Sequence, residues 1–323
     1  MQPISIGDIL EAGNRIAGVI HRTPLLHSES LSEMSGVNLF FKTENFQKTG
    51  SFKIRGAANK IFSLPREEGA RGIVTASSGN HGQAVAFASR VCGYSAAVVM
   101  PEGGSPAKAA SIKAYGAELI YRGTTTEERM SLAKKICEER GAVYVPPYDD
   151  PFVMAGQGTI GLEILEDLED AAAVLVPTGG CGLISGIATA LKEKNAGIAV
   201  LGVEPEGSNS TGMSFRAGRR TALDKIDTIA DGIRTTIPGE LTFPVVQRYV
   251  DDMLTVTDED VLHAQYMILE RCKMLAEPTG AVSAAAVLCG VLPEKFRGRN
   301  VVALISGGNV AMSSLADCLK KTC

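Results

Sequence analysis

The sequence has no apolar run of the roughly 18 residues that a transmembrane helix requires. Its first residues show no basic segment followed by an apolar one, so we expect no secretory signal and a cytoplasmic location. It has no basic run, and the formal net charge is −4 over 323 residues, which argues against nucleic-acid binding through phosphate neutralisation. The chain is therefore expected to bind neither a membrane nor a nucleic acid.

The seven cysteines are scattered, and none belongs to a Cys-x-x-Cys pair. An odd number at scattered positions is typical of reduced thiols in the cytosol, not of a disulfide framework or a zinc site. Hydrophobic residues make up 45% of the chain and charged residues 21%, which is ordinary for a globular protein. Glycine, in contrast, occurs 35 times, which indicates tight turns or close approaches of the backbone to a ligand.

A strand, a helix and a glycine recur in that order between residues 70 and 148. Strands that alternate with helices of about 10–15 residues predict a parallel sheet. We expect its strands near residues 73–75, 96–100, 118–121 and 142–145, and its helices to end at Gly93, Gly116 and Gly141.

A second α/β series follows this unit. We expect strands at 174–176, 198–203 and 301–305 and a helix over 257–274. Residues 206–245 are irregular by sequence. Residues 1–69 contain a predicted helix over 6–20 and a strand over 39–43, and the pattern alone leaves open which sheet they join.

The first candidate site lies at residues 49–56, where Lys53 follows Phe52 at the start of a predicted helix flanked by glycines. A helix N-terminus favours anions, and burial there would lower the pKa of an amine. A neutral Lys53 could then form a Schiff base with an aldehyde cofactor. Taken alone, the segment fits an exposed lysine on an amphipathic helix better.

The second candidate site is the run Ser-Ser-Gly-Asn-His-Gly-Gln at residues 77–83, between a predicted strand and a helix. Its backbone N–H groups and short polar side chains suit a carboxylate. Ser77 or Ser78 could instead cap the helix, but capping does not need two glycines as well. His81 taken alone is more often structural than catalytic.

The third candidate site, residues 177–183, has three glycines in four residues between a strand and a helix. Such a loop lets N–H groups close on a phosphate, although it lacks both the dinucleotide pattern and the Lys-Ser/Thr of a nucleotide P-loop. A tight turn is the alternative, but one glycine usually suffices for that. Ser306 ends the last predicted strand, and ligands lie beyond the carboxyl ends of strands in open parallel sheets. These loops are therefore expected to meet at one crevice.

Two glutamates each precede a proline. Glu277 lies between two helical stretches and fits a solvated turn as well as a site. Glu204 ends a strand and is a weak candidate for a metal ligand. Arg234 could meet a second carboxylate of a substrate, but we interpret it as a solvated charge.

Taken in order, these motifs resemble the pyridoxal-phosphate (PLP) dependent tryptophan-synthase-β family, fold type II, in its serine/threonine dehydratase and serine racemase branch. The similarity extends over residues 21–309 and includes Ala-Gly-Gln-Gly-Thr at 155–159. It implies an α/β fold with two open, twisted, mainly parallel sheets and helices on both faces. It also implies a large PLP-binding domain of residues 1–68 and 149–323, with an inserted small mobile domain, 69–148, that closes over the substrate.

The resemblance also implies roles for the matching residues. Lys53 would hold PLP through a Schiff base and remove the substrate α-proton, and Ser306 would face the pyridine nitrogen. Further cofactor contacts would come from Phe52, Asn80, Gly179, Gly180, Cys181, Gly182 and Leu183, and the substrate carboxylate would be bound by Ser77, Ser78, Asn80 and His81. Cys181 interrupts what is a run of four glycines in relatives.

Ser306 bears on the type of reaction. A carboxylate at this position would keep the pyridine nitrogen protonated and stabilise a long-lived carbanion, whereas a neutral serine does so much less and favours prompt loss of a β-hydroxyl. The predicted activity is that of an L-threonine/L-serine ammonia-lyase, which takes a small β-hydroxy amino acid to a 2-oxo acid and ammonia. Because serine racemases have serine at the position of Ser78, racemase activity is an alternative, as is 3-hydroxyaspartate dehydratase.

Other expectations concern metals, partners and competing functions. Relatives with a divalent cation site have an acidic residue where this chain has Ser210, so metal activation is not favoured and Glu204 stays the candidate ligand. The resemblance implies a homo-oligomer, either a dimer or a tetramer. A β-replacement enzyme and a non-catalytic small-molecule binding protein are the competing interpretations. The Ser-Ser-Gly-Asn-His run argues against the first, and the intact Lys53 argues against the second.

Overall fold

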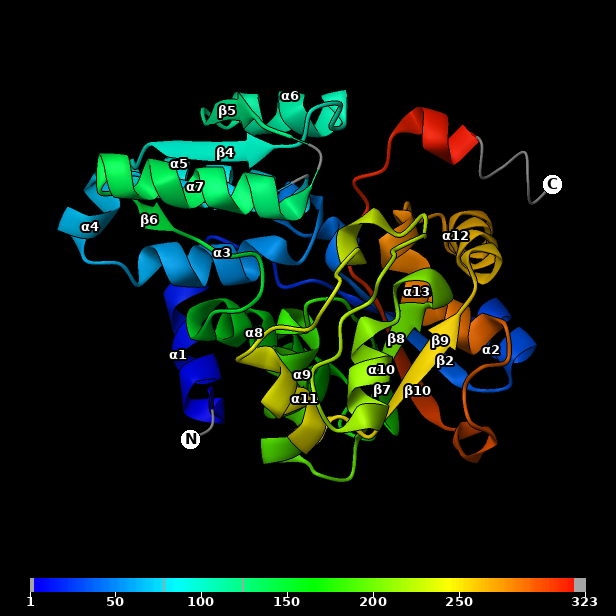
Figure 1. Cartoon of the computed structure of the whole chain (residues 1–323). Helices are drawn as coiled ribbons and strands as arrows, with labels where there is room; N and C mark the ends of the chain where they lie inside the picture. Colours follow the sequence, from blue (N-terminus) through cyan, green and yellow to red (C-terminus); the bar gives the residue numbers. More distant parts are fainter. Residues whose placement is uncertain (1–2, 78, 124, 317–323) are drawn as a thin grey trace.

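The computed structural model of the chain describes residues 3–77, 79–123 and 125–316 (Figure 1). The larger of its two sheets has the strand order β1-β2-β10-β7-β8-β9 and is parallel except for β1. Its strands are β1 (Leu25–His27), β2 (Asn38–Thr43), β7 (Ala173–Pro177), β8 (Ala199–Pro205), β9 (Asp252–Val256) and β10 (Asn300–Ile305). The smaller sheet, β5-β4-β3-β6, is parallel throughout. Its strands are β3 (Ile73–Ala76), β4 (Ala96–Met100), β5 (Glu118–Tyr121) and β6 (Val143–Tyr144).

Helices cover both faces of the larger sheet. Successive residues of a strand point to opposite faces, and β10 accordingly sends Val301 and Ala303 into a core with α12 and α13, and Val302 and Leu304 into a core with α8 and α9. The helices are α1 (Ile6–Ile16), α2 (Glu29–Ser35), α3 (Lys53–Phe62), α4 (Arg66–Ala70), α5 (Asn80–Cys92), α6 (Pro106–Ala114), α7 (Thr126–Arg140), α8 (Pro151–Asp167), α9 (Gly182–Lys194), α10 (Ser210–Ala217), α11 (Thr242–Tyr249), α12 (Asp258–Cys272) and α13 (Pro278–Leu288). The predicted α/β class with two mainly parallel sheets is confirmed.

The smaller sheet lies between α5 and α7 (Figure 1). Val74 and Val99 face α7, and Val98 faces α5 and α6. Gly93 and Gly141 end α5 and α7 with φ angles of 73° and 63°, the left-handed conformation expected of a helix-ending glycine. No helix in the described ranges is both long and apolar enough to cross a membrane.

The N-terminal segment contributes to both parts of the molecule. Its strand β2 pairs with β10, so it extends the larger sheet. Its helix α3 packs against α5, which covers the smaller sheet, and against α8, which covers the larger one. Helix α3 begins at Lys53, so this lysine lies where the two sheets meet.

Two sequence predictions of secondary structure were wrong, and one strand was missed. The helix expected over 6–20 ends at Ile16, because Ala17 leaves the helical conformation with ψ 139° and Gly18 follows with a left-handed φ of 78°. Residues 206–245 are expected to be irregular, but they contain the whole of α10 and the first residues of α11. The strand β9 ends just before α12 and was not predicted.

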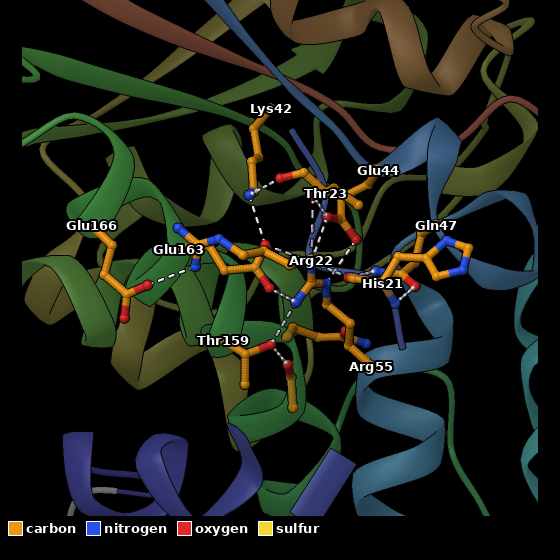
Figure 2. Close-up of polar contacts among 12 residues, drawn as sticks. His21, Arg22, Thr23, Lys42, Glu44, Gln47, Arg55, Thr159, Glu163 and Glu166 are labelled. Carbon is orange, nitrogen blue, oxygen red and sulfur yellow. Dashed lines mark hydrogen bonds and ion pairs between the residues drawn. The ribbon is translucent and has the colours of Figure 1, made fainter. Parts of the chain in front are cut away.

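A buried network of charges joins α3, β2 and α8 (Figure 2). The guanidinium of Arg55 donates to Glu44 at 2.8 Å and to Glu163 at 2.6 Å, and Lys42 Nζ donates to Glu163 at 2.6 Å. Arg55, Glu44 and Lys42 have no exposed side-chain surface. This network, defined by these four residues, anchors the helix that begins at Lys53.

Candidate active site

A cavity of about 170 Å³ lies between the carboxyl ends of strands from both sheets. Residues from α3, the β3–α5 loop, the β7–α9 loop and the end of β10 line it. Of the residues predicted for the site, those that line it are Phe52, Lys53, Ser77, Asn80, His81, Gly179, Gly180, Cys181, Gly182, Leu183 and Ser306. Ser78 lies outside the described residues. The three loops therefore meet at one crevice, as the strand-end argument predicts.

Lys53 is held against the end of β10. The N–H of Phe52 donates to the carbonyl of Ser306 at 3.1 Å, which fixes the residue before the lysine. Lys53 Nζ donates to the carbonyl of Pro147 at 2.8 Å. Burial lowers the pKa of Lys53 to about 8, and the carboxylate of Glu277 acts in the opposite direction. About a tenth of this amine is therefore neutral at pH 7, and a nucleophile requires this neutral form.

The lowered pKa of Lys53 predicts how the cofactor-free protein reacts with a small aldehyde. A shift from 10.5 to about 8 raises the neutral fraction of the amine at pH 7 roughly 300-fold. We expect reductive trapping at Lys53, followed by peptide mass spectrometry across a pH series, to be half-maximal near pH 8. A short lysine peptide treated in parallel is the control. A half-maximum near pH 10.5 for both would contradict the prediction.

The β3–α5 loop combines a helix cap with a fixed asparagine. Ser77 Oγ accepts the N–H groups of Gly79 at 3.2 Å and Gly82 at 3.0 Å. The N-cap residue of α5 is Gly79, so Ser77 satisfies an N–H of the first helical turn without being the N-cap residue itself. Asn80 Nδ2 donates to Glu277 Oε1 at 2.6 Å. Burial, with the nearby charge of Lys53, lowers the pKa of His81 to about 3, so its imidazole is neutral. The loop can thus bind an anion through N–H and amide groups, with no charge from the histidine.

The glycines of the β7–α9 loop leave no room for side chains. A Cβ atom on Gly180 would lie 2.5 Å from the ring of Tyr148, and one on Gly182 would lie 2.8 Å from the same residue. The carbonyls of Gly179 and Gly180 accept hydrogen bonds from Thr211 and Thr242. Because the first N–H groups of a helix lack intrahelical acceptors, the start of α9 can bind an anion such as a phosphate.

The remaining wall of the cavity contains Ser306 and Glu277, both 2% exposed. Ser306 Oγ donates to the carbonyl of Thr279 at 3.4 Å. The sequence did not decide between a site and a solvated turn for Glu277, because a Glu-Pro pair before a helix has the same pattern in either case. The structure buries it, and also brings Arg129 and Tyr148 to the cavity, which no motif had indicated.

Comparison with known proteins identifies the fold family. The family described as pyridoxal-phosphate dependent enzyme matches residues 16–307. The chain belongs to this PLP-dependent enzyme family. The PLP-dependent chain is 45% identical to an L-threonine ammonia-lyase of Thermotoga maritima, over 98% of this chain and 79% of that protein. It is 42% identical to the catabolic L-threonine dehydratase TdcB of Escherichia coli K12, over 98% and 96%.

Solved structures give the same assignment. Maize serine racemase superposes on this PLP-dependent chain with a TM-score of 0.93 at 40% identity, covering 99% of this chain and 98% of that one. The processed form of threonine deaminase isoform 2 from Solanum lycopersicum gives a TM-score of 0.92 at 38% identity, covering 98% and 91%. The predicted fold type II family, in its dehydratase and racemase branch, is confirmed.

The cavity of this PLP-dependent chain fits the cofactor of its family. Gly179, Gly180 and Gly182 of the β7–α9 loop, here called the glycine cradle, can hold a phosphate, and Lys53 offers a partly neutral amine. Phe52 supplies an aromatic ring beside this amine, with Lys53 Nζ 5.0 Å from the ring centroid. Ser306 offers a hydroxyl and Asn80 an amide to a heteroaromatic ring. Each polar group of PLP thus has a chemically suitable counterpart.

Glu204, the candidate metal ligand, lies near the end of β8 and contacts the start of α10. Its carboxylate accepts the N–H groups of Thr211 at 3.0 Å and Gly212 at 2.7 Å, so it caps α10. Burial raises its pKa to about 7, while these two N–H groups act in the opposite direction. The described part of the chain contains no group of three or more His, Cys, Asp or Glu side chains that could hold a metal ion.

Proposed function

We propose that the chain is a PLP-dependent L-threonine/L-serine ammonia-lyase, which eliminates water from the substrate and releases a 2-oxo acid and ammonia. The observation that carries the proposal is the convergence of Lys53, the glycine cradle and the neutral Ser306 on one cavity. Relatives named threonine ammonia-lyase and threonine dehydratase, 42–45% identical over nearly the full chain, support it. The substrate is a small β-hydroxy amino acid.

Different residues of the chain bind the cofactor, bind the substrate and transfer the proton. PLP, when bound, supplies an electron sink for the electrons left on the substrate Cα. The loop of residues 179–183 holds the phosphate, and Ser77 with the start of α5 binds the substrate carboxylate. Lys53 Nζ accepts the Cα proton, a role that suits an amine whose pKa is about 8.

Ser306 selects elimination over slower reactions at Cα. A hydroxyl group does not hold a proton on the ring nitrogen as a carboxylate would. Negative charge at Cα is then relieved best by departure of the β-hydroxyl. The proposal therefore assigns the type of reaction to the absence of charge on Ser306.

Residues 69–148 act as a small domain that closes over the substrate, and residues 1–68 and 149–323 form the large domain. Two observations support this part of the proposal. The four strands β3 to β6 form a sheet of their own. Lys108 in α6, which packs beside that sheet, pairs with Asp231 across the cavity at 2.8 Å.

We also infer that the protein is a homo-oligomer, as the family resemblance implies, and that it is located in the cytoplasm.

The test is to purify the protein with PLP and supply L-threonine or L-serine. We expect a visible absorbance band from bound cofactor and the release of 2-oxo acid and ammonia in equal amounts. Sulfide should leave the products unchanged, because β-replacement is not the reaction. Absence of the band after addition of PLP would overturn the proposal and leave a binding protein with this fold.

Serine racemase activity is the second candidate function, favoured by the TM-score of 0.93 to maize serine racemase. Racemisation needs a proton donor on the face of the cofactor opposite Lys53, and Ser78 is the residue proposed for it. Chiral analysis of the L-serine reaction should then show D-serine, which Ser78→Ala removes while elimination continues. If that variant keeps both activities in full, the two-base idea fails.

Removal of divalent cations is expected to leave the enzyme unchanged. Both oxygens of Glu204 already accept N–H groups of α10, so this carboxylate stabilises the start of the helix without a metal. Dialysis against EDTA should alter neither turnover nor Tm, whereas Glu204→Ala should cost about 1–2 kcal/mol of stability through the lost cap. Glu206→Ala at an exposed position is the matched control. A Tm that rises with Mg²⁺ in the wild type but not in Glu204→Ala would contradict this.

A further inference from the structure

Glu277 is a buried carboxylate that neither the phosphate nor the carboxylate site uses. Its Oε1 accepts a hydrogen bond from Asn80 Nδ2 at 2.6 Å, and its Oε2 has no hydrogen-bond partner among the described residues. Removing a carboxylate from water is costly unless its oxygens find donors. Within the described part of the chain, the donor that reaches this carboxylate is the asparagine that lines the cavity.

An asparagine amide can face either way, and its partners decide which. A carboxylate accepts hydrogen bonds, so Glu277 requires the nitrogen of Asn80 on its side. On the other side, Asn309 Nδ2 donates to Asn80 Oδ1 at 2.9 Å. Rotating the Asn80 amide by 180° would put oxygen against carboxylate and N–H against N–H.

The orientation of Asn309 is itself fixed. Its Nδ2 also donates to the carbonyl of Thr49 at 2.7 Å, and a backbone carbonyl can only accept. Thr49 and Asn309 belong to the segments that hold Lys53 against the end of β10, because Gly308 N donates to Gly50 O at 2.9 Å. One chain of hydrogen bonds thus runs from the lysine segment through Asn309 and Asn80 to Glu277.

This chain of contacts leaves one N–H of Asn80 unused by Glu277, on a side chain that lines the cavity. We propose that Glu277 is a positioning residue, whose carboxylate holds the Asn80 amide so that it presents an N–H donor to an acceptor oxygen on the ring of the bound cofactor. The inference rests on the proposed function, because it assumes that PLP occupies this cavity. Glu277 acts through Asn80 and need not touch the substrate.

The charged groups around Glu277 come from several elements. Burial has the largest effect and raises the pKa of Glu277 to about 7. Lys108 of α6 and Lys53 of α3 act to lower this pKa, and Asp231 acts to raise it. Lys108 pairs with Asp231. Among the described residues, the hydrogen bond that the Glu277 side chain makes in the cavity is therefore the one from Asn80 Nδ2 to its Oε1, an oxygen that can accept in either protonation state.

The experiment is a double-mutant cycle on the affinity of the cofactor-free protein for PLP. Glu277→Leu should weaken binding about tenfold, the effect of one lost charge-assisted hydrogen bond. Asn80→Ala should weaken it to a similar degree, and the double variant should be no weaker than Asn80→Ala alone. Glu277→Gln keeps an acceptor oxygen and should restore binding to within about threefold of the wild type.

A second readout separates positioning from folding. The visible band of bound cofactor should shift alike in Glu277→Leu and Asn80→Ala, because both remove the same donor. Ser283 lies in α13, and Ser283→Ala, which loses the buried hydrogen bond to the Leu304 carbonyl of β10, should lower Tm without moving the band. If the leucine variant does not fold, Glu277→Asp replaces it, because the shorter side chain cannot reach Asn80 as closely.

The outcomes distinguish this inference from the proposed function. If the wild type binds no PLP, the proposed function fails. If the wild type binds PLP but the Glu277 and Asn80 effects add in the double variant, or if the band does not move in Glu277→Leu, the positioning role is overturned while the proposed function stands.

Discussion

Replacing Lys53 with alanine is expected to abolish turnover and the visible band of the bound cofactor. The band requires an amine that can bond covalently to an aldehyde, and Lys53 Nζ, held by the neutral carbonyl of Pro147, is such an amine. Loss of the proton acceptor alone lowers rates by roughly 10²–10⁴-fold, and loss of the covalent link adds to it. Absorbance spectroscopy and 2-oxo acid assays measure both effects.

Lys108→Ala is the matched control, because Lys108 lines the same cavity. Burial acts to lower the pKa of Lys108, but the carboxylates of Asp231 and Glu277 outweigh it and raise the pKa, so this amine stays charged and unreactive. We expect the control to keep the band. The assignment of the nucleophile would be wrong if Lys108→Ala lost the band and Lys53→Ala kept it.

Replacing Arg55 with methionine is expected to destabilise the protein by about 3–5 kcal/mol, the cost of breaking a buried ion pair. Arg55 holds Glu44 and Glu163, and neither it nor Glu44 has any exposed side-chain surface (Figure 2). Burial opposes the charge on Arg55, but the two carboxylates raise its pKa above the ordinary value. Methionine would leave Glu44 buried without its cation.

Urea unfolding measures this loss, with the slope of the transition as a check that the same surface unfolds. Arg297→Met is the matched control, because its pair with Glu294 is 73% and 81% exposed and should change stability by no more than about 0.5 kcal/mol. A loss below about 1 kcal/mol for Arg55→Met would mean that the network rearranges around the gap.

The chemistry of the site could be predicted where local sequence decides it. Lys53 at a helix start and the glycines of the 177–183 loop are local features. Steric contact with Tyr148 explains why Gly180 and Gly182 cannot carry side chains, and Ile233 has the same effect at Gly179. Similarly, strands alternating with glycine-terminated helices indicated parallel sheets. These predictions needed no knowledge of distant contacts.

The features that the sequence missed depend on side chains outside the element concerned, and several of these are far apart along the chain. Helix α10 is capped by Glu204 and helix α11 by Asp149, which accepts the N–H groups of residues 240–242 from more than 90 positions away. Neither helix has a capping side chain at its own N-cap residue, so the usual start signal is missing. Asn80, the partner of Glu277, is 197 positions away. Glu163, one partner of Arg55, is 108 positions away, so no local pattern identifies these contacts.

The alkylation of Cys181 can be used to follow the opening of the β7–α9 loop. This residue is 3% exposed, burial raises the pKa of its thiol, and its Sγ contacts the Gly179 carbonyl and the Thr211 hydroxyl. An alkylating reagent therefore reaches it only when the β7–α9 loop separates from its surroundings. The alkylation rate of Cys181 therefore measures how often the phosphate-binding loop opens. A bound anion should slow this alkylation, so the rate also reports how much of the phosphate site is occupied, without any assay of catalysis.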